Sequence, residues 1–208
     1  MKKIKNNVEN LKIDNKKIIL ASKSPRRRKL LEDIFGEDII IHPSNIDENS
    51  IKEKDPIKLA KKLAFLKAKE VSNFYDKGII IAADSFVVYK NKILGKPKDK
   101  KDAFNMLKLQ SGKKTKVITG LCVIDLNKQK EYLTYDITEI KMTKMNDEEI
   151  LNYIKTGDPL DKAGSFGMQS KGSIFVEKIN GCYSNVVGLP MPKLLKILRK
   201  IGLKIFNY

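Results

Sequence analysis

The stretch Ile18-Ile19-Leu20-Ala21-Ser22-Lys23-Ser24-Pro25-Arg26-Arg27-Arg28-Lys29-Leu30-Leu31 is the most informative part of the chain. Its leading apolar residues predict a short buried strand, and Ser24 can cap a helix whose first position suits Pro25. The N–H groups of a first helical turn are free and partially positive, and Arg26 and Arg27 add cationic donors there. The stretch therefore predicts an anion site suited to phosphate, although a basic first turn on a surface helix would have the same spacing.

The composition is that of a globular protein with a large excess of positive charge. The 208 residues fit one domain, with enough apolar content for a full core. Lysine and arginine number 42 against 25 acids, a net charge of +17. Nucleic-acid grooves tend to use arginine, whereas here lysines predominate and are scattered over the chain. We interpret the excess as compositional, with weak non-specific binding to polyanions as its consequence.

Histidine and cysteine are too scarce for several kinds of site. The single His42 and the distant Cys122 and Cys182 argue against structural zinc, a Ser-His-Asp triad and a Cys-His pair. Any catalysis would rest on carboxylates, lysines, arginines and hydroxyls, with an oxygen-liganded ion such as magnesium. We find no signal peptide or membrane-length apolar run and expect a cytoplasmic protein. Residues 1–15 are expected to form a flexible basic extension before a single domain over 16–208.

Strands and helices alternate in the first half of the chain, and a long hairpin occupies the middle. This order favours an α/β fold with a mixed sheet. The polar loop at 158–172 contains several glycines and is long enough to be functional. Another loop is expected at 180–188. Strands are expected at 18–20, 39–42, 79–83, 116–126, 131–142 and 172–178, and helices at about 25–34, 55–74, 99–109, 146–156 and 189–201.

Asp84 is the strongest candidate for catalysis, because it follows five apolar residues that should be buried. Ligand crevices form where strands of α/β sheets end, although an aspartate there can also simply cap a turn. Ser85 adds a hydroxyl, and Lys96 would return close to Asp84 if a hairpin forms at Lys90–Lys92. Lys67 is expected away from the core side of its helix. It is as readily explained as a solvated lysine, and Glu48 as an exposed loop acid.

Several motifs together resemble one known family. The first is Ser22-Lys23-Ser24-Pro25-Arg26-Arg27, and the others follow in order along nearly the whole chain. The other motifs are Ala83-Asp84-Ser85, Gly95-Lys96-Pro97, Ser111-Gly112, Thr119-Gly120, Gly157-Asp158-Pro159-Leu160-Asp161-Lys162-Ala163-Gly164-Ser165-Phe166-Gly167-Met168-Gln169 and Asn185-Val186-Val187-Gly188-Leu189-Pro190. The family that these motifs resemble is the Maf family, also called septum-formation-inhibitor-like.

The resemblance implies a nucleoside triphosphate pyrophosphatase, which forms a monophosphate and pyrophosphate with a divalent metal, Mg²⁺ or Mn²⁺. It implies an inosine-triphosphatase-like fold: an elongated mixed sheet flanked by helices, with two lobes and a central cleft. By the same resemblance Asp84 is the catalytic proton acceptor, and Glu48 and Asp84 are metal ligands. Substrate contacts are then expected at Ser22, Arg26, Arg27, Lys67, Ser85, Lys96 and Gln169.

At Arg26 and Gln169 this chain resembles the family members that act on dTTP and UTP. Those members usually have threonine at the position of Ser85. Serine keeps the hydroxyl and loses the methyl group. The first hypothesis is therefore a dTTP/UTP pyrophosphatase that can include modified pyrimidine nucleotides. The alternatives are a pyrophosphatase for 7-methyl-GTP or another modified purine, and a basic nucleic-acid-binding protein with a vestigial site. Relatives are often dimers, so a homodimer is expected, without a specific nucleic acid or a membrane as partner.

Overall fold

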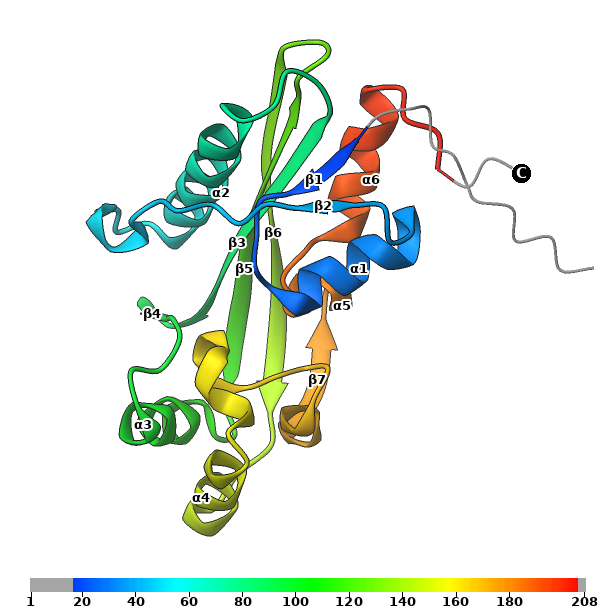
Figure 1. The fold of residues 1–208 in the computed structure, drawn as a ribbon. Helices are drawn as coiled ribbons and strands as arrows, with labels where there is room; N and C mark the ends of the chain where they lie inside the picture. The colour runs from blue at the N-terminus through cyan, green and yellow to red at the C-terminus, as the bar shows by residue number, and fades with distance from the viewer. Residues whose placement is uncertain (1–16, 206–208) are drawn as a thin grey trace, which may run out of the picture.

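The computed structural model describes residues 17–205, so the expected extension over 1–15 lies outside the described residues. A seven-stranded mixed sheet runs the length of the molecule, in the order β2-β1-β3-β5-β6-β7, with β4 also paired to β3 (Figure 1). The predicted α/β fold with a mixed sheet flanked by helices is confirmed. The strands are β1 Ile18–Leu20, β2 Ile40–Ile41, β3 Ile79–Tyr89, β4 Lys92–Leu94, β5 Lys114–Asp125, β6 Lys130–Met142 and β7 Val176–Asn180.

The helices that begin with a capping side chain start where the sequence signals place them. Ser24 caps α1 and accepts a hydrogen bond from the backbone N–H of Arg27, with Pro25 in the first turn. Asp55 caps α2, and Asn146 forms a capping box with Glu149 at α4. The α-helices are α1 Pro25–Phe35, α2 Pro56–Ser72, α3 Lys100–Gln110, α4 Asp147–Lys155, α5 Tyr183–Val187 and α6 Met191–Lys200, and the 3₁₀ helices are η1 Glu48–Ser50, η2 Asp158–Asp161, η3 Ala163–Ser165 and η4 Lys171–Phe175.

Three expected elements differ from the structure. The loop at 180–188 contains α5, and the strand expected at 172–178 begins only at Val176, after a 3₁₀ turn. Asp84 lies in the middle of an eleven-residue strand rather than at a strand end. The reason is that Asp84 pairs with Gly120 of β5, and the backbone hydrogen bonds of an antiparallel ladder continue through a polar residue as readily as through an apolar one.

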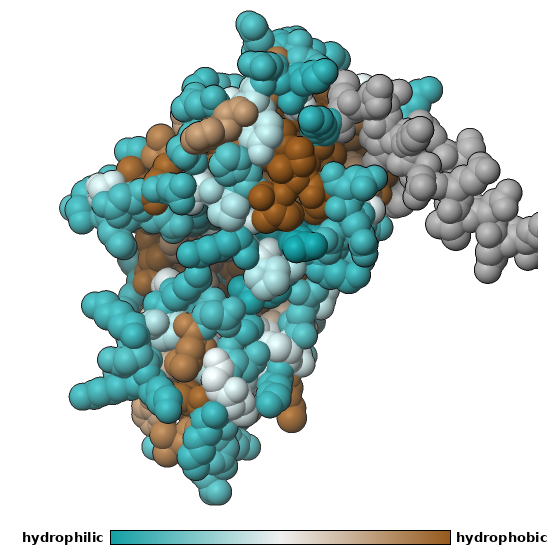
Figure 2. All heavy atoms as spheres, in the orientation of Figure 1, coloured by the Kyte–Doolittle hydropathy of each residue, from teal (hydrophilic) through white to brown (hydrophobic). Residues whose placement is uncertain are grey.

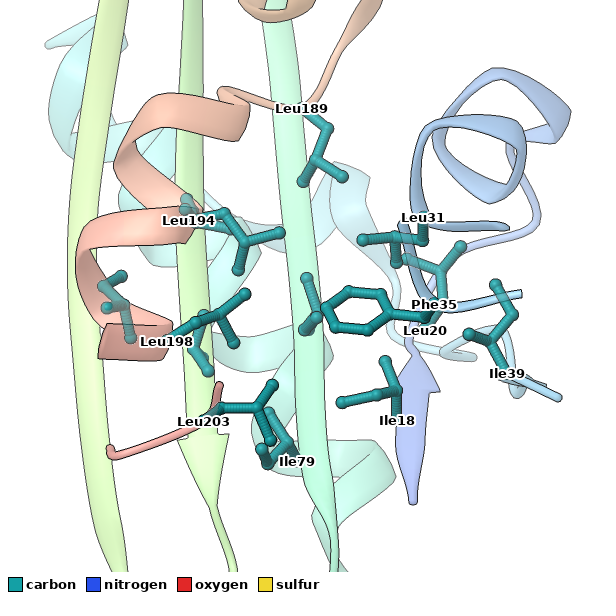
Figure 3. Close-up of a cluster of buried hydrophobic side chains, with 14 of the residues drawn as sticks. Ile18, Leu20, Leu31, Phe35, Ile39, Ile79, Leu189, Leu194, Leu198 and Leu203 are labelled. Atoms are coloured by element: carbon teal, nitrogen blue, oxygen red, sulfur yellow. The ribbon is translucent and has the colours of Figure 1, made fainter. Parts of the chain in front are cut away.

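The half of the molecule that contains β1 packs α1 and α6 on one face of the sheet. Figure 3 shows Leu31 and Phe35 of α1, and Leu194 and Leu198 of α6, converging on the strands. All four are buried. Figure 2 shows a hydrophobic patch on this half of the molecule, in the region of β1 and α6, and mostly hydrophilic atoms on the other half. We call this half the upper lobe.

A second apolar cluster forms the other half, the lower lobe. It includes Leu107 of α3, Ile150 of α4 and Ile140 of β6, all fully buried. Figure 1 places α3 and α4 at the end of the sheet away from α6. The long strands β3, β5 and β6 run through both lobes, which are thus built on one continuous sheet.

The two lobes leave a gap along one edge of β3. One edge is paired with β5 from Ile79 to Val88. The other edge pairs with β1 only at 79–81 and with β4 only at 87–89. Among the described residues 17–205, no strand therefore pairs with residues 82–86 on that side, and Asp84 lies at the centre of this gap. The gap exists because β1 and β4 are too short to meet along β3.

Helix α2 covers the opposite face of the sheet from α1 and α6. It packs directly on β5 at Gly120, where an added Cβ would lie 2.2 Å from the carbonyl oxygen of Ala60. No helix within residues 17–205 is long and apolar enough to cross a membrane.

Candidate active site

A cavity of about 1010 Å³ opens at the free edge of β3, between the two lobes. Its lining comes from segments far apart in the sequence, including the turn after β1, the loop before α2 and the loop after η3. Every residue that the sequence suggested for the site lines this one cavity. These residues are Ser22, Arg26, Arg27, Glu48, Lys67, Asp84, Ser85, Lys96 and Gln169.

Two carboxylates converge on one ammonium group in the cavity. Lys67 Nζ contacts Asp84 Oδ1 and lies 2.9 Å from Glu48 Oε1. The Lys67 and Asp84 side chains are only 10% and 8% exposed, whereas Glu48 is 54% exposed. The prediction that Lys67 lies away from the core side of its helix is wrong. It follows Leu63 and Ala64 by one helical turn and lies with them on the face packed against the sheet.

Burial raises the pKa of Asp84 above its ordinary value, and this effect exceeds the opposing attraction of Lys67 and Arg27. Removing a carboxylate from water disfavours its charged form, while the nearby cations favour it. The result is a carboxyl group that holds its proton more tightly than an exposed aspartate does. A group with this property accepts a proton more readily from a water molecule.

Arg27 is a half-buried guanidinium held by three neutral acceptors. Its Nε donates to the carbonyl oxygen of Gly188 at 2.7 Å, one Nη to Ser22 Oγ at 3.1 Å and the other to Ser85 Oγ at 3.0 Å. Burial lowers its pKa from the ordinary arginine value, yet a guanidinium stays charged in proteins. Arg27 thus connects α1, β3 and the end of α5, and supplies a fixed positive charge to the cavity.

Asp84 and Ser85 lie on opposite faces of the sheet, as successive strand residues must. Asp84 faces α2 and contacts Lys67, whereas Ser85 accepts from Arg27 on the α1 side and hydrogen-bonds Thr119 at 2.9 Å. The expectation that Ser85 places a hydroxyl beside the acid is therefore only partly met. Because no strand of the described part of the chain pairs with β3 here, one ligand at this edge can reach both faces.

The lower lobe contributes Lys96 and Gln169. Gly95, before Lys96, accepts a hydrogen bond from the backbone N–H of Gly164 at 2.9 Å. The loop that carries Gln169 is held by Asp158, which accepts hydrogen bonds from Tyr153 at 2.7 Å and from Ser170 at 2.8 Å. Both cavity residues thus lie on loops whose positions are fixed by backbone or buried polar contacts.

Glu48 and Asp84 form a donor set suited to Mg²⁺. Their oxygens already approach one cation, the Lys67 ammonium. Within residues 17–205 no group of three or more His, Cys, Asp and Glu side chains is placed to hold a metal ion. Mg²⁺ is typically bound by one or two carboxylates together with substrate phosphates and water, so the two acids fit an ion that binds together with a polyphosphate.

Sequence reasoning missed two charged residues of the cavity. Asp161 Oδ2 lies 3.1 Å from an Nη of Arg26, and Asp161 Oδ1 lies 2.7 Å from Lys162 Nζ. Asp161 and Lys162 both lie in the motif at 157–169, so the sequence already marked this segment as part of the resemblance. The contact of Asp161 with Arg26, 135 positions away in the sequence, was not predicted from it.

Known proteins resemble this chain over nearly its whole length. A protein named dTTP/UTP pyrophosphatase from Ruminiclostridium cellulolyticum is 48% identical over 191 residues, 91% of this chain and 98% of its own. Proteins of the same name from Alkaliphilus oremlandii and Methanosarcina barkeri are 50% and 44% identical, covering 88% and 92% of this chain and 95% and 98% of their own.

Among solved structures, a HAM1 protein from Coxiella burnetii aligns with a TM-score of 0.44 at 13% identity, over 89% of this chain and 99% of that chain. The family model described as Maf-like protein matches residues 17–201. This match spans both lobes and all nine predicted site residues, and relatives at 44–50% identity cover 88–92% of the chain. The chain therefore belongs to the Maf family.

Proposed function

We propose that this protein is a nucleoside triphosphate pyrophosphatase that acts on dTTP and UTP. The observation on which the proposal depends is the arrangement in the cavity: a buried acid, Asp84, surrounded by the cations Lys67, Arg26, Arg27 and Lys96. Relatives of this name are 42–50% identical over most of the chain. A polyanion with a reacting phosphorus atom matches such a site better than a neutral ligand does.

The proposed reaction is attack of water on the α-phosphorus, with pyrophosphate as leaving group. The oxygen of water forms a bond to phosphorus, the bond from phosphorus to the bridging oxygen breaks, and the water proton passes to the Asp84 carboxylate. The raised pKa of Asp84 supports its role as acceptor. Displacement at phosphorus otherwise requires positioning and charge neutralisation, which fixed cations can supply.

The cations of the cavity would contribute to the reaction in different ways. Arg27 is fixed by Ser22, Ser85 and Gly188 and contributes charge without needing to move. Arg26 and Lys96 come from opposite lobes and would bind the departing pyrophosphate. Glu48 and Asp84 would hold Mg²⁺ or Mn²⁺, which when bound would neutralise phosphate charge.

Gln169 and Ser85 are proposed to contribute to base selection, as the resemblance implies. A side-chain amide offers both a donor and an acceptor, which suits the edge of a pyrimidine. The homodimer and the cytoplasmic location stay predictions.

A nucleotide panel tests the proposal. Purified protein with Mg²⁺ is incubated with dTTP, UTP, 7-methyl-GTP and inosine triphosphate, and the products are separated by ion-exchange chromatography. We expect dTTP and UTP to have a kcat/KM at least about tenfold above the purines, a difference of about 1.4 kcal/mol. The products should be monophosphate and pyrophosphate, whereas a diphosphate product or a preference for 7-methyl-GTP would contradict the assignment.

Asp84→Asn protein prepared in parallel controls for a contaminating phosphatase, because it should lose the activity. The nucleic-acid alternative is tested by measuring duplex DNA binding against salt concentration. Binding that persists at physiological salt and survives Asp84→Asn would favour that alternative.

A further inference from the structure

The two neighbouring arginines of α1 are held in different ways. Arg27 is half-buried and donates to three neutral acceptors, Ser22, Ser85 and the carbonyl oxygen of Gly188. Arg26 is 27% exposed, and its guanidinium has one acceptor among residues 17–205, the carboxylate of Asp161. The arginine with a single acceptor is therefore paired with an acid, whereas the arginine with three acceptors is held by neutral groups.

Asp161 reaches Arg26 from the opposite lobe. Arg26 lies in the first turn of α1 in the upper lobe, and Asp161 ends η2, which contacts α3 and α4 of the lower lobe. Both line the cavity. The Asp161 side chain is 61% exposed, so its carboxylate stays close to water. An ion pair this exposed is weak and readily exchanged for another.

Release of Asp161 would leave no buried charge without a partner. Asp161 also accepts a hydrogen bond from Lys162 Nζ. Without it, Lys162 Nζ still donates to two atoms of Asp158, the backbone oxygen at 2.6 Å and Oδ1 at 3.1 Å. The free Asp161 carboxylate would be hydrated. The unfavourable part of the exchange is limited to the loss of two contacts, with Arg26 and with Lys162, both made by an exposed carboxylate.

We propose that Asp161 competes with the phosphates of the ligand for Arg26. Its carboxylate pairs with the Arg26 guanidinium until a polyphosphate displaces it. The inference rests on the proposed function, because it takes Arg26 to bind phosphate oxygens of substrate and product. Asp161 then acts through Arg26: its carboxylate occupies the Arg26 guanidinium in the free protein and so weakens the binding of pyrophosphate. A weaker hold on pyrophosphate favours its release, so Asp161 adjusts affinity through Arg26 without contacting the reacting atoms.

The test measures binding of inorganic pyrophosphate, by isothermal titration calorimetry in one magnesium-containing buffer. Asp161→Asn removes the competing charge, and we expect the Kd for pyrophosphate to fall about three- to fivefold, the range of an exposed ion pair. The difference should shrink at 0.5 M salt, because screening weakens exposed pairs. Asp161→Glu keeps the charge and should return the Kd toward that of the parent.

Asp33→Asn is the matched control. Asp33 lies on the same helix as Arg26, pairs with Lys29 on the surface and is 52% exposed, so its substitution makes the same change in net charge outside the cavity. We expect it to leave the Kd unchanged. Steady-state assays with dTTP should show KM falling in Asp161→Asn, with a lower inhibition constant for pyrophosphate.

An unchanged or higher Kd in Asp161→Asn would overturn the inference, because Asp161 would then not compete for Arg26. An equal fall of the Kd in Asp33→Asn would also overturn it, because net charge alone would explain the effect. Failure of the parent to release pyrophosphate from any nucleotide would instead overturn the proposed function. The binding comparison does not depend on turnover and separates the two.

Discussion

Gly120→Ala should uncouple helix α2 from the sheet. The added Cβ would lie 2.2 Å from the carbonyl oxygen and 2.3 Å from the carbonyl carbon of Ala60 in α2. Both are backbone atoms, so no side-chain rotation relieves the clash. Ordinary van der Waals contact begins at 3.4 Å, and the helix would have to retreat by about 1 Å at Ala60.

The retreat has a structural and a catalytic consequence. Inserting a methyl group into a packed core costs typically about 1–3 kcal/mol, and the unyielding backbone places this site near the upper end, about 3 kcal/mol. Lys67 lies seven residues from Ala60 on the same helix face, and Gly120 pairs with Asp84 across the strands. The displacement therefore moves Lys67 away from Asp84. A misplacement of about 1 Å in an active site can lower the rate about a hundredfold.

Two measurements check this prediction. Urea unfolding followed by circular dichroism gives the free energy of unfolding, and steady-state turnover of dTTP gives kcat. Gly95→Ala is the control for stability, because its Cβ meets nothing within 4 Å and should change the free energy of unfolding by less than about 1 kcal/mol. A Gly120→Ala protein with the stability and kcat of the parent would refute the close packing of α2 on β5.

The other predictions concern the charged groups of the cavity. Asp84→Asn should lower kcat at least about a hundredfold, as expected for loss of a general base, and steady-state kinetics within tenfold of the parent would contradict it. Because burial raises the pKa of Asp84 above 3.8, the acidic limb of kcat/KM should have its midpoint above that value. The folded state then binds this proton more tightly than the unfolded chain, so the contribution of Asp84 to stability falls as pH rises from 3.8 through the raised pKa. Urea titrations across this range should show the fall in the parent, and a flatter profile in Asp84→Asn. Arg27→Lys should lower the free energy of unfolding by about 2 kcal/mol, since an ammonium cannot reproduce the three fixed hydrogen bonds, and an unchanged urea midpoint would count against the network. EDTA should abolish pyrophosphate release and added Mg²⁺ should restore it, whereas full activity in EDTA would exclude the divalent ion.

Local signals in the sequence were enough to predict the helices that begin with caps. Ser24 with Pro25, Asp55 and Asn146 each offer a side-chain acceptor to free backbone N–H groups, an interaction that spans three residues. In the turn between β5 and β6, Asp125 Oδ1 accepts a hydrogen bond from the backbone N–H of Lys128, a contact that also spans three residues. The short helix α5 and the 3₁₀ helices of the 158–175 segment had no side-chain cap, and they form through contacts with distant elements.

The sequence by itself determined which residue types are available to the site, and the motifs connected them to the Maf family. Only the tertiary structure decided how they meet. Lys67 looked like a solvated lysine, yet it is buried because β3 supplies Asp84 and the loop before α2 supplies Glu48. Asp161 pairs with Arg26 although 135 positions separate them. Such contacts depend on which strand edge is left open and which helix covers which face, and neither is encoded within one segment of the chain.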